Sequence, residues 1–309
     1  MIKKIFILII VFISLNKFTL ANENVFIVAT VEDQIITNHD IIKESDYLMI
    51  LNPKLSQLDE KQIRKIANES LINEIIKKNE IKKILDMTKE NTYVNEYMKD
   101  LYTRLNFKDE ADFKNYLSNF SNYSFNEIKE KINIEIMWNE LIFFKYGDQV
   151  NINKERLLEK INNLDDEIRN EYNLSEIIFK KKKNISLDDQ INEIKSSIAD
   201  IGFNNTANIY SIAESSKLGG NIGWINENNL SEKIFKMIKK LEQNDVTEIV
   251  QIGNNYILLK INEIRQKNIP KNKKEELNKM VKFETNKQLN QFSKIFFDKA
   301  KINYSINEK

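Results

Sequence analysis

The sequence of 309 residues contains no cysteine and a single histidine, His39. Without thiols the chain forms no disulfide, no thiolate metal site and no cysteine nucleophile. One imidazole does not build a histidine-based zinc site, and no Asp/Asn/Gly loop has the spacing of a calcium site. We therefore expect no metal and no cofactor.

Glycine and proline are also scarce, with six and two residues in the whole chain. Three of the six glycines nevertheless lie in one patch, Gly219-Gly220-Asn221-Ile222-Gly223-Trp224. Such clustering indicates backbone with positive φ or a close approach between chain segments. The patch is the most informative local feature of the sequence.

A charge excess of either sign is missing as well. Lys and Arg number 47 against 46 Asp and Glu, so the formal net charge is +1. No global field attracts nucleic acid, and we expect no nucleic-acid partner. With 30% charged and 41% hydrophobic residues, the composition is typical of a helix-rich globular chain, and its length favours two domains.

The N-terminus resembles an export signal. Two lysines, Lys3 and Lys4, precede an apolar run from Ile5 to Leu15, which is shorter than the ~20 residues of a membrane-spanning helix. A site of small residues ends at Ala21, after which we expect cleavage. An uncleaved anchor in the inner membrane is the alternative; in either case the chain works outside the cytoplasm, where no ATP is available.

The first part of the mature chain reads as a helical module with a small β entry. A β-branched run, a turn and a second short strand lead into a helix capped by Thr37 or Asn38. Ser124 with Glu127 forms a capping box for a later helix. Apolar residues at helical spacing predict helices over 59–85, 92–105, 109–120, 124–144 and 153–169.

A second unit has an α+β pattern, and a long charged helix follows it. Strands are expected over 174–180, 246–252 and 256–264, with a hairpin turn at Gly253-Asn254-Asn255. Helices are expected over 187–199, 203–211 and 230–241. The final helix, 271–299, has an aromatic side that must pack, and we expect it to return to the N-terminal helices.

These motifs together resemble the SurA-type periplasmic chaperones with one parvulin (PpiC-type) peptidyl-prolyl isomerase, or rotamase, domain. The resemblance rests on the opening strand Val28–Ile41, the helix around Leu71–Ile76, the strand Leu174–Ile178, and the glycine patch followed by Asn244–Val250. It implies an α+β fold in which a parvulin-like domain is inserted into a mostly helical chaperone module. The implied boundaries are 1–21 for the signal, 22–165 for the helical module, 166–266 for the parvulin-like domain and 267–309 for the returning helix.

The resemblance also implies positions for the polar groups of the isomerase, and here the sequence departs from the family. Two histidines and an Asp or Cys are replaced by Glu176, Ala213 and Ile257. Glu176 is either a buried carboxylate with a raised pKa or, as we favour, a solvated or ion-paired residue near the lysine run 180–183. We therefore expect no confident catalytic residue and a domain that is degenerate as an isomerase.

The resemblance also implies an apolar cup for the proline ring, and its residues are better preserved than the polar groups. It comprises Leu230 and Ile234 or Phe235, although ordinary core packing explains these residues equally well. Trp224 is either a substrate platform or, as we favour, a core anchor. His39 is expected in a helix N-cap turn, far from this cup.

The leading hypothesis from the sequence is an exported, ATP-independent holdase for unfolded outer-membrane or secreted polypeptides, in contact with the outer-membrane assembly machinery. A working prolyl isomerase with an altered pocket is the competing hypothesis. A membrane-anchored foldase is the third.

Overall fold

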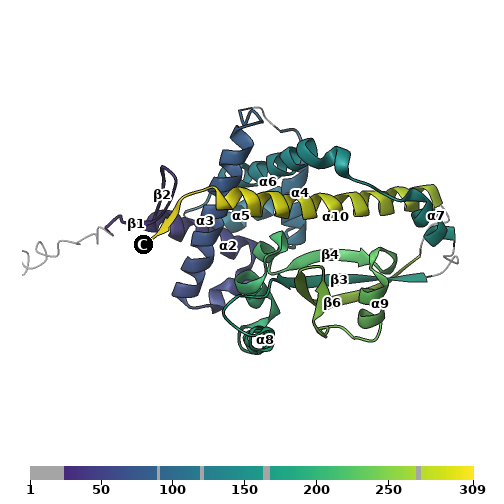
Figure 1. Cartoon of the computed structure of the whole chain (residues 1–309). Helices are drawn as coiled ribbons and strands as arrows, with labels where there is room; N and C mark the ends of the chain where they lie inside the picture. Colours follow the sequence, from purple (N-terminus) through teal and green to yellow (C-terminus); the bar gives the residue numbers. More distant parts are fainter. Residues whose placement is uncertain (1–23, 89–90, 119–121, 163–167, 269–272) are drawn as a thin grey trace, which may run out of the picture.

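The computed structural model describes residues 24–88, 91–118, 122–162, 168–268 and 273–309. A helical module at the top and a sheet with its helices at the bottom form the two halves of the molecule (Figure 1). The proposed signal segment, residues 1–21, lies outside the described residues. No helix in the described part of the chain is long and apolar enough to cross a membrane.

Both ends of the described chain meet in a three-stranded antiparallel sheet of order β2-β1-β7. The predicted entry hairpin is confirmed as β1 (Ile27–Val31) and β2 (Gln34–Thr37). The third strand, β7 (Ile306–Glu308), was not predicted, and it pairs with β1 so that Ala29 faces Glu308. The chain therefore closes on itself at this sheet.

The helices of the upper half begin at side-chain caps. Thr37, Asp59 and Ser124 each accept a hydrogen bond from the third backbone N–H of their helix, in capping boxes. Replacing such a cap costs about 1 kcal/mol of helix stability. The elements are α2 (Asn38–Leu51), η1 (Pro53–Gln57), α3 (Glu60–Lys82), α4 (Val94–Arg104), α5 (Glu110–Leu117), α6 (Phe125–Tyr146), η2 (Gly147–Gln149) and α7 (Lys154–Asn162).

The last helix, α10 (Lys273–Ile302), returns to this module as predicted, and it runs across the upper half in yellow (Figure 1). Trp138 of α6 is fully buried against it. The indole Nε1 donates a hydrogen bond to Ser293 Oγ at 2.8 Å, and the ring stacks on Phe296 at 5.5 Å. The aromatic side of α10 is therefore core, which explains why it is so rich in phenylalanine.

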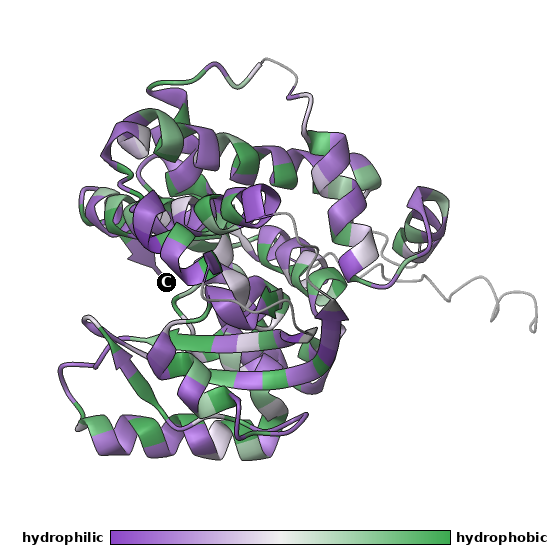
Figure 2. Ribbon diagram, turned by 90° about the vertical axis from the view of Figure 1, so that its right-hand side faces the viewer, coloured by the Kyte–Doolittle hydropathy of each residue, from purple (hydrophilic) through white to green (hydrophobic). Residues whose placement is uncertain are grey.

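The lower half is a four-stranded antiparallel sheet of order β4-β3-β6-β5. One face packs on α8 through residues such as Ile177 and Phe203, and the other packs on α9 through Leu174 and Ile238. A long helix lies beneath the sheet in Figure 2, and the helical module lies above it. The elements are β3 (Ile168–Phe179), α8 (Leu187–Tyr210), η3 (Glu214–Leu218), β4 (Asn221–Asn226), η4 (Glu227–Asn229), α9 (Glu232–Ile238), β5 (Val250–Ile252) and β6 (Asn255–Asn268).

Several element boundaries differ from the prediction. The helix predicted over 153–169 ends at Asn162, and Arg169 already lies in β3. This polar end of β3 is stable as a strand because Arg265 and Lys267 on β6 neutralise Glu171 across the ladder. The charge of Glu171 is neutralised by residues of another strand, so the sequence around Glu171 does not predict the strand.

Other differences concern shorter elements. The strand β4 after the glycine pair was not predicted, and the strand predicted over 246–252 is regular only from Val250. The helices predicted over 187–199 and 203–211 form one element, α8, with a kink at Gly202, whose φ is +82°. The predicted α+β class, with a mostly helical module and a returning helix, is nevertheless confirmed.

Candidate functional site

The three positions that resemblance assigns to the isomerase lie around one stretch of β3. Glu176 lies on β3, and Ile257 of β6 pairs with Ile178, two residues further along. Ala213 caps η3 immediately after Ile212, whose N–H donates to the Ile178 carbonyl at 2.7 Å. The structure therefore brings Glu176, Ala213 and Ile257 to one end of the sheet.

The glycine pair of the patch allows the backbone to approach β3 at this point. Gly219 and Gly220 have φ of +64° and +79°, and Glu176 N donates to the Gly220 carbonyl at 2.8 Å. A Cβ on Gly220 would lie 2.3 Å from the Glu176 carbonyl oxygen. No side chain fits there, so glycine is required where the chain passes beside Glu176.

Glu176 is the acidic member of these three positions. Burial raises the pKa of its carboxyl, and the hydrogen bond from Ser215 Oγ, at 2.9 Å, opposes that shift only in part. The favoured interpretation of a solvated or ion-paired residue near the lysine run is wrong, because the half-buried Glu176 has Ser215 as its partner, while Lys180 pairs with Asp298 at 2.7 Å and Lys182 approaches Glu193. The alternative of a buried carboxylate with a raised pKa describes the structure.

The other two positions supply no polar group. Ile257 is 8% exposed and belongs to the core between the sheet and α9, while the side chain of Ala213 is a methyl group. His39 lies exposed in the first turn of α2, as expected, in the other half of the molecule. The described residues thus place the Glu176 carboxyl here with the hydroxyls of Ser215 and Ser211, the latter accepting from the backbone N–H groups of Ile178 and Ala213, and no imidazole.

Two residues of the predicted apolar cup, Leu230 and Ile234, pack in one cluster. Ile234 is 7% exposed in the core, and Leu230 packs against the same cluster. Phe235 is half-buried on the other side of α9. Trp224 is not a core anchor: it is half-buried, and the guanidinium of Arg265 lies 3.9 Å above its ring.

The short helix η3 joins this site to the helical module. Lys217 Nζ lies 3.2 Å from Glu135 of α6, and Lys77 of α3 contacts Glu135 at 2.6 Å and Glu214 at 3.3 Å. Leu218 packs into the core beside α2 and α6. η3 is therefore held by charges and by apolar contact with the other half.

The electrostatics of this cluster favour its charged form. Burial alone would raise the pKa of Glu135, but the ammonium groups of Lys77 and Lys217 outweigh it and lower that pKa. Burial would lower the pKa of Lys217, but Glu135 outweighs it and raises that pKa. Glu135 and Lys217 therefore both stay ionised at neutral pH.

Amide side chains add neutral contacts between the halves. Asn52 Nδ2 donates to Asn208 Oδ1 at 2.6 Å, and Asn208 Nδ2 donates to the Ser216 carbonyl at 2.6 Å. Asn205 Nδ2 donates to the Lys54 carbonyl at 3.0 Å. Sequence reasoning missed this junction; its nearest signal was the position of Glu214 and Lys217 beside the glycine pair.

A metal site has no basis in the described residues, where no three His, Cys, Asp or Glu side chains group so as to hold an ion. What the site holds instead is a protonatable carboxyl beside a hydroxyl, on a segment clamped by the other half of the molecule. That arrangement can donate or accept one hydrogen bond.

Comparison with known proteins identifies the lower half. Residues 173–263 match the family model Rotamase, described as the PPIC-type PPIASE domain. A solved PpiC-type peptidyl-prolyl cis-trans isomerase domain is 21% identical, covering 32% of this chain and 94% of its own, with a TM-score of 0.29. None of the curated proteins compared with the chain matches it.

Longer solved structures are also similar to the chain. One is described among two SurA-like chaperones of Campylobacter jejuni, PEB4 and Cj1289, with 16% identity, 92% and 98% of the two chains covered, and a TM-score of 0.34. Another is PrsA from Bacillus subtilis, with 16% identity, 77% and 85% covered, and a TM-score of 0.29. The parvulin part of the resemblance drawn from the sequence is confirmed over residues 173–263, which match the PPIC-type peptidyl-prolyl isomerase domain, and the whole chain is similar to a SurA-like chaperone.

Proposed function

We propose that the protein is an exported, ATP-independent holdase for unfolded outer-membrane or secreted polypeptides, with a parvulin domain that is degenerate as an isomerase. The observation that carries the proposal is the loss of polar groups around Glu176. Ile257 is buried in the core and Ala213 has no polar atom in its side chain. Without a pair of imidazoles, the domain is retained for shape and binding.

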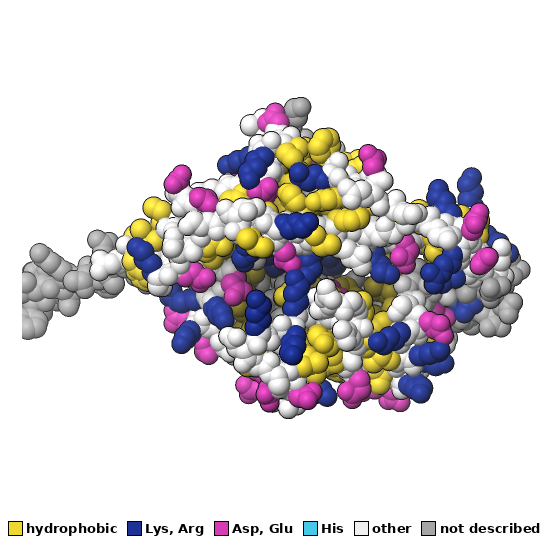
Figure 3. Space-filling view, viewed as in Figure 1, with side chains coloured by type: hydrophobic (Ala, Val, Ile, Leu, Met, Phe, Trp, Pro, Cys, Tyr) yellow, Lys and Arg dark blue, Asp and Glu magenta, His cyan; other side chains and the backbone are white. Residues whose placement is uncertain are grey.

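Exposed apolar side chains on the helical module support a binding role. Phe143 and Phe144 at the end of α6 are 61% and 71% exposed, and Ile295 of α10 is 51% exposed. Hydrophobic side chains are visible across the upper half in Figure 3, with charged groups between them. Clustered apolar surface of this kind marks interaction sites, while the charged groups keep a chaperone and its client soluble.

In this proposal the helical module comprises 22–165 and 267–309, and the parvulin-like domain comprises 166–266. The chain works in the periplasm after cleavage behind Ala21, and it delivers clients to the outer-membrane assembly machinery. Mass spectrometry of the exported protein tests the cleavage, with Asn22 expected as the mature N-terminus. A chain that keeps Met1 would instead support an anchored foldase.

Light scattering of an unfolded client tests the holdase activity. The wild-type chain is expected to suppress aggregation at a ratio near one to one, and Phe143→Ser with Phe144→Ser is expected to halve the suppression. Ile252→Ser is the matched control, because this residue is 48% exposed on the parvulin domain. Unchanged aggregation with the wild-type chain would refute the proposal.

A working isomerase with an altered pocket is the second candidate, and the Glu176–Ser215 hydrogen bond favours it. A buried acid can donate a proton toward an imide and weaken its double-bond character, whose barrier is ~20 kcal/mol. A protease-coupled proline-peptide assay separates the two candidates. Catalysis that Glu176→Gln abolishes would establish the enzyme; rates equal to the uncatalysed exchange support the holdase alone.

A further inference from the structure

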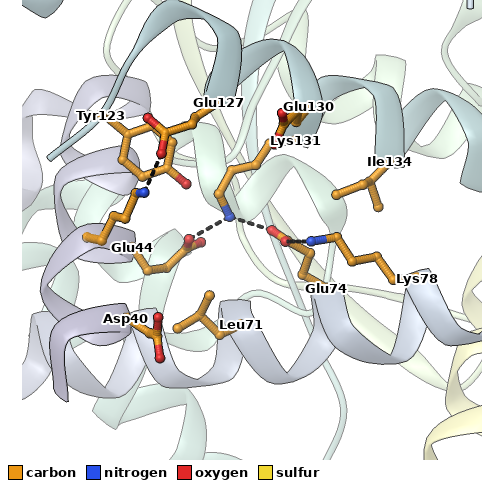
Figure 4. A pocket seen from close by; sticks show the side chains of 11 residues that line it. Asp40, Glu44, Leu71, Glu74, Lys78, Tyr123, Glu127, Glu130, Lys131 and Ile134 are labelled. Atoms are coloured by element: carbon orange, nitrogen blue, oxygen red, sulfur yellow. Dashed lines mark hydrogen bonds and ion pairs between the residues drawn. The ribbon is translucent and has the colours of Figure 1, made fainter. Parts of the chain in front are cut away.

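A cleft of about 270 Å³ opens between α2, α3 and α6, on the helical module (Figure 4). It is large enough for one long side chain and too small for a folded segment. The cleft lies outside the parvulin-like domain.

The floor of the cleft is a fixed and compensated ion cluster. Lys131 of α6 lies between Glu44 of α2, at 2.6 Å, and Glu74 of α3. Ser70 Oγ donates to Glu44 at 2.6 Å, and Lys78 contacts the other oxygen of Glu74 at 2.7 Å. Because the side chains of Lys131 and Glu44 are only 10% and 1% exposed, these groups hold the helices together and are not free for a ligand.

Two groups above this floor, the Tyr123 hydroxyl and the exposed Glu130 carboxylate, have no hydrogen-bond or ion-pair partner among the described residues, although Lys43 lies over the ring of Tyr123 at 5.4 Å. Tyr123 is only 7% exposed, its ring stacks on Tyr47 at 5.4 Å, and no described group hydrogen-bonds to its hydroxyl. Glu130 likewise has no ion-pair partner in the described part of the chain. Both line the cleft on the side of α6 (Figure 4).

The charge of the lining selects the kind of ligand. The cleft is lined by five carboxylates and three ammonium groups, so its net charge is −2. The lysines are already paired, Lys43 with Glu127 and the other two with the floor carboxylates. An anion is therefore repelled, and a cation is attracted to the uncompensated side.

We propose that this cleft binds the lysine or arginine side chain of an unfolded client polypeptide. The cation would lie beside the Glu130 carboxylate and the Tyr123 hydroxyl oxygen. Leu71 and Ile134, which also line the cleft, would contact its aliphatic stem. The proposal rests on the holdase function and adds a charge preference to it.

Fluorescence anisotropy with the full chain tests the preference. Two labelled, extended peptides of one sequence are compared, differing only in whether their single lysine is Nε-acetylated. The free lysine is expected to bind about three- to fivefold tighter, the range of one partly exposed charge contact, and 1 M salt is expected to remove the difference. Glu130→Gln and Tyr123→Phe are each expected to reduce the preference.

Matched controls and a second assay separate the possible outcomes. Glu96→Gln and Tyr93→Phe alter an exposed carboxylate and an exposed phenol elsewhere on the module and are expected to keep the preference. Equal affinity for both peptides, with aggregation still suppressed, would overturn the cleft proposal and leave the holdase intact. Failure to bind either peptide, together with unsuppressed aggregation, would overturn both. A preference that survives both cleft substitutions would place the cation elsewhere and overturn the assignment.

Discussion

Glu135 is the centre of the junction between the two halves, and Glu135→Gln is the most informative perturbation of it. The carboxylate contacts Lys77 at 2.6 Å and Lys217 at 3.2 Å. The amide of glutamine keeps the size of the side chain but removes its charge. The ammonium groups of Lys77 on α3 and Lys217 on η3 would then lie near each other without the Glu135 carboxylate that both contact.

The expected cost follows from the burial of the three groups. Removing one partner of a fully buried ion pair costs about 3–5 kcal/mol, whereas an exposed pair is worth about 1 kcal/mol or less. The side chain of Lys77 is 10% exposed, but those of Glu135 and Lys217 are 37% and 30% exposed. An intermediate loss of about 2 kcal/mol is therefore expected.

Urea denaturation measures this loss, and hydrogen exchange of residues 214–218 locates it. Glu135→Gln is expected to speed exchange at η3, and a second substitution, Lys217→Met, is expected to restore part of the stability because it removes the opposing charge. Glu140→Gln is the control on the same helix: among the described residues, its exposed carboxylate accepts only from Asn91, at 2.7 Å. A change in Glu135→Gln no larger than in this control, or unaltered exchange at η3, would refute the reasoning.

Three further predictions concern stability. Gly220→Ala is expected to cost at least about 3 kcal/mol in urea denaturation, because its Cβ would lie 2.3 Å from a carbonyl oxygen. Gly223→Ala is the control and should cost only about 1–2 kcal/mol, because Gly223 has a φ of +75° but nothing within 4 Å of the added Cβ. Equal costs for the two substitutions would contradict this explanation. Hydrogen bonds from Lys43 and Ser124 lower the pKa of Glu127 to about 2 from 4.5, so its contribution is present above pH 4.5 and lost as the pH falls through 2. Glu127→Gln should therefore cost about 1 kcal/mol at pH 7 and clearly less at pH 2, as judged by urea midpoints at the two values. Burial raises the pKa of Glu176, so ionisation of its carboxyl lowers the stability of the fold as the pH rises above 4.5. The free energy of unfolding of Glu176→Gln should therefore equal that of the wild type at pH 4 and exceed it at pH 8. A variant less stable than the wild type at pH 8 would contradict this reasoning.

Local patterns predicted most of the regular structure. The capping box at Ser124, the hairpin turn after Ile252 and the long helix after Pro270 depend on neighbouring residues, and the structure confirms each of them. The strand β7 and the polar start of β3 were missed because each is stabilised only by a distant partner. For β7 that partner is β1, which lies more than 250 residues away in sequence.

In the candidate site, too, the sequence predicted the positions of residues but not their distant partners. Resemblance placed Glu176, Ala213 and Ile257, and the structure brings them to one end of the sheet. The environment of Glu176 was misjudged, because the neighbouring lysines pair with Asp298 and Glu193 instead. The partner of a charged side chain depends on which distant helix packs beside it, and the spacing of charges along the chain carries no such information.

The sequence by itself determined the class of the protein: an α+β chain with no thiol chemistry, one histidine and a glycine patch that identifies a parvulin domain. Glycine in that patch is dictated by backbone sterics, which act over a few residues and are therefore legible in the sequence. Only the tertiary structure decided that Glu176 is half-buried beside Ser215, that η3 is clamped by Glu135 and Lys77, and that the cleft at Tyr123 is open. Burial and charge pairing are properties of surfaces brought together by folding, so they follow from the packing of distant elements and not from the order of the residues.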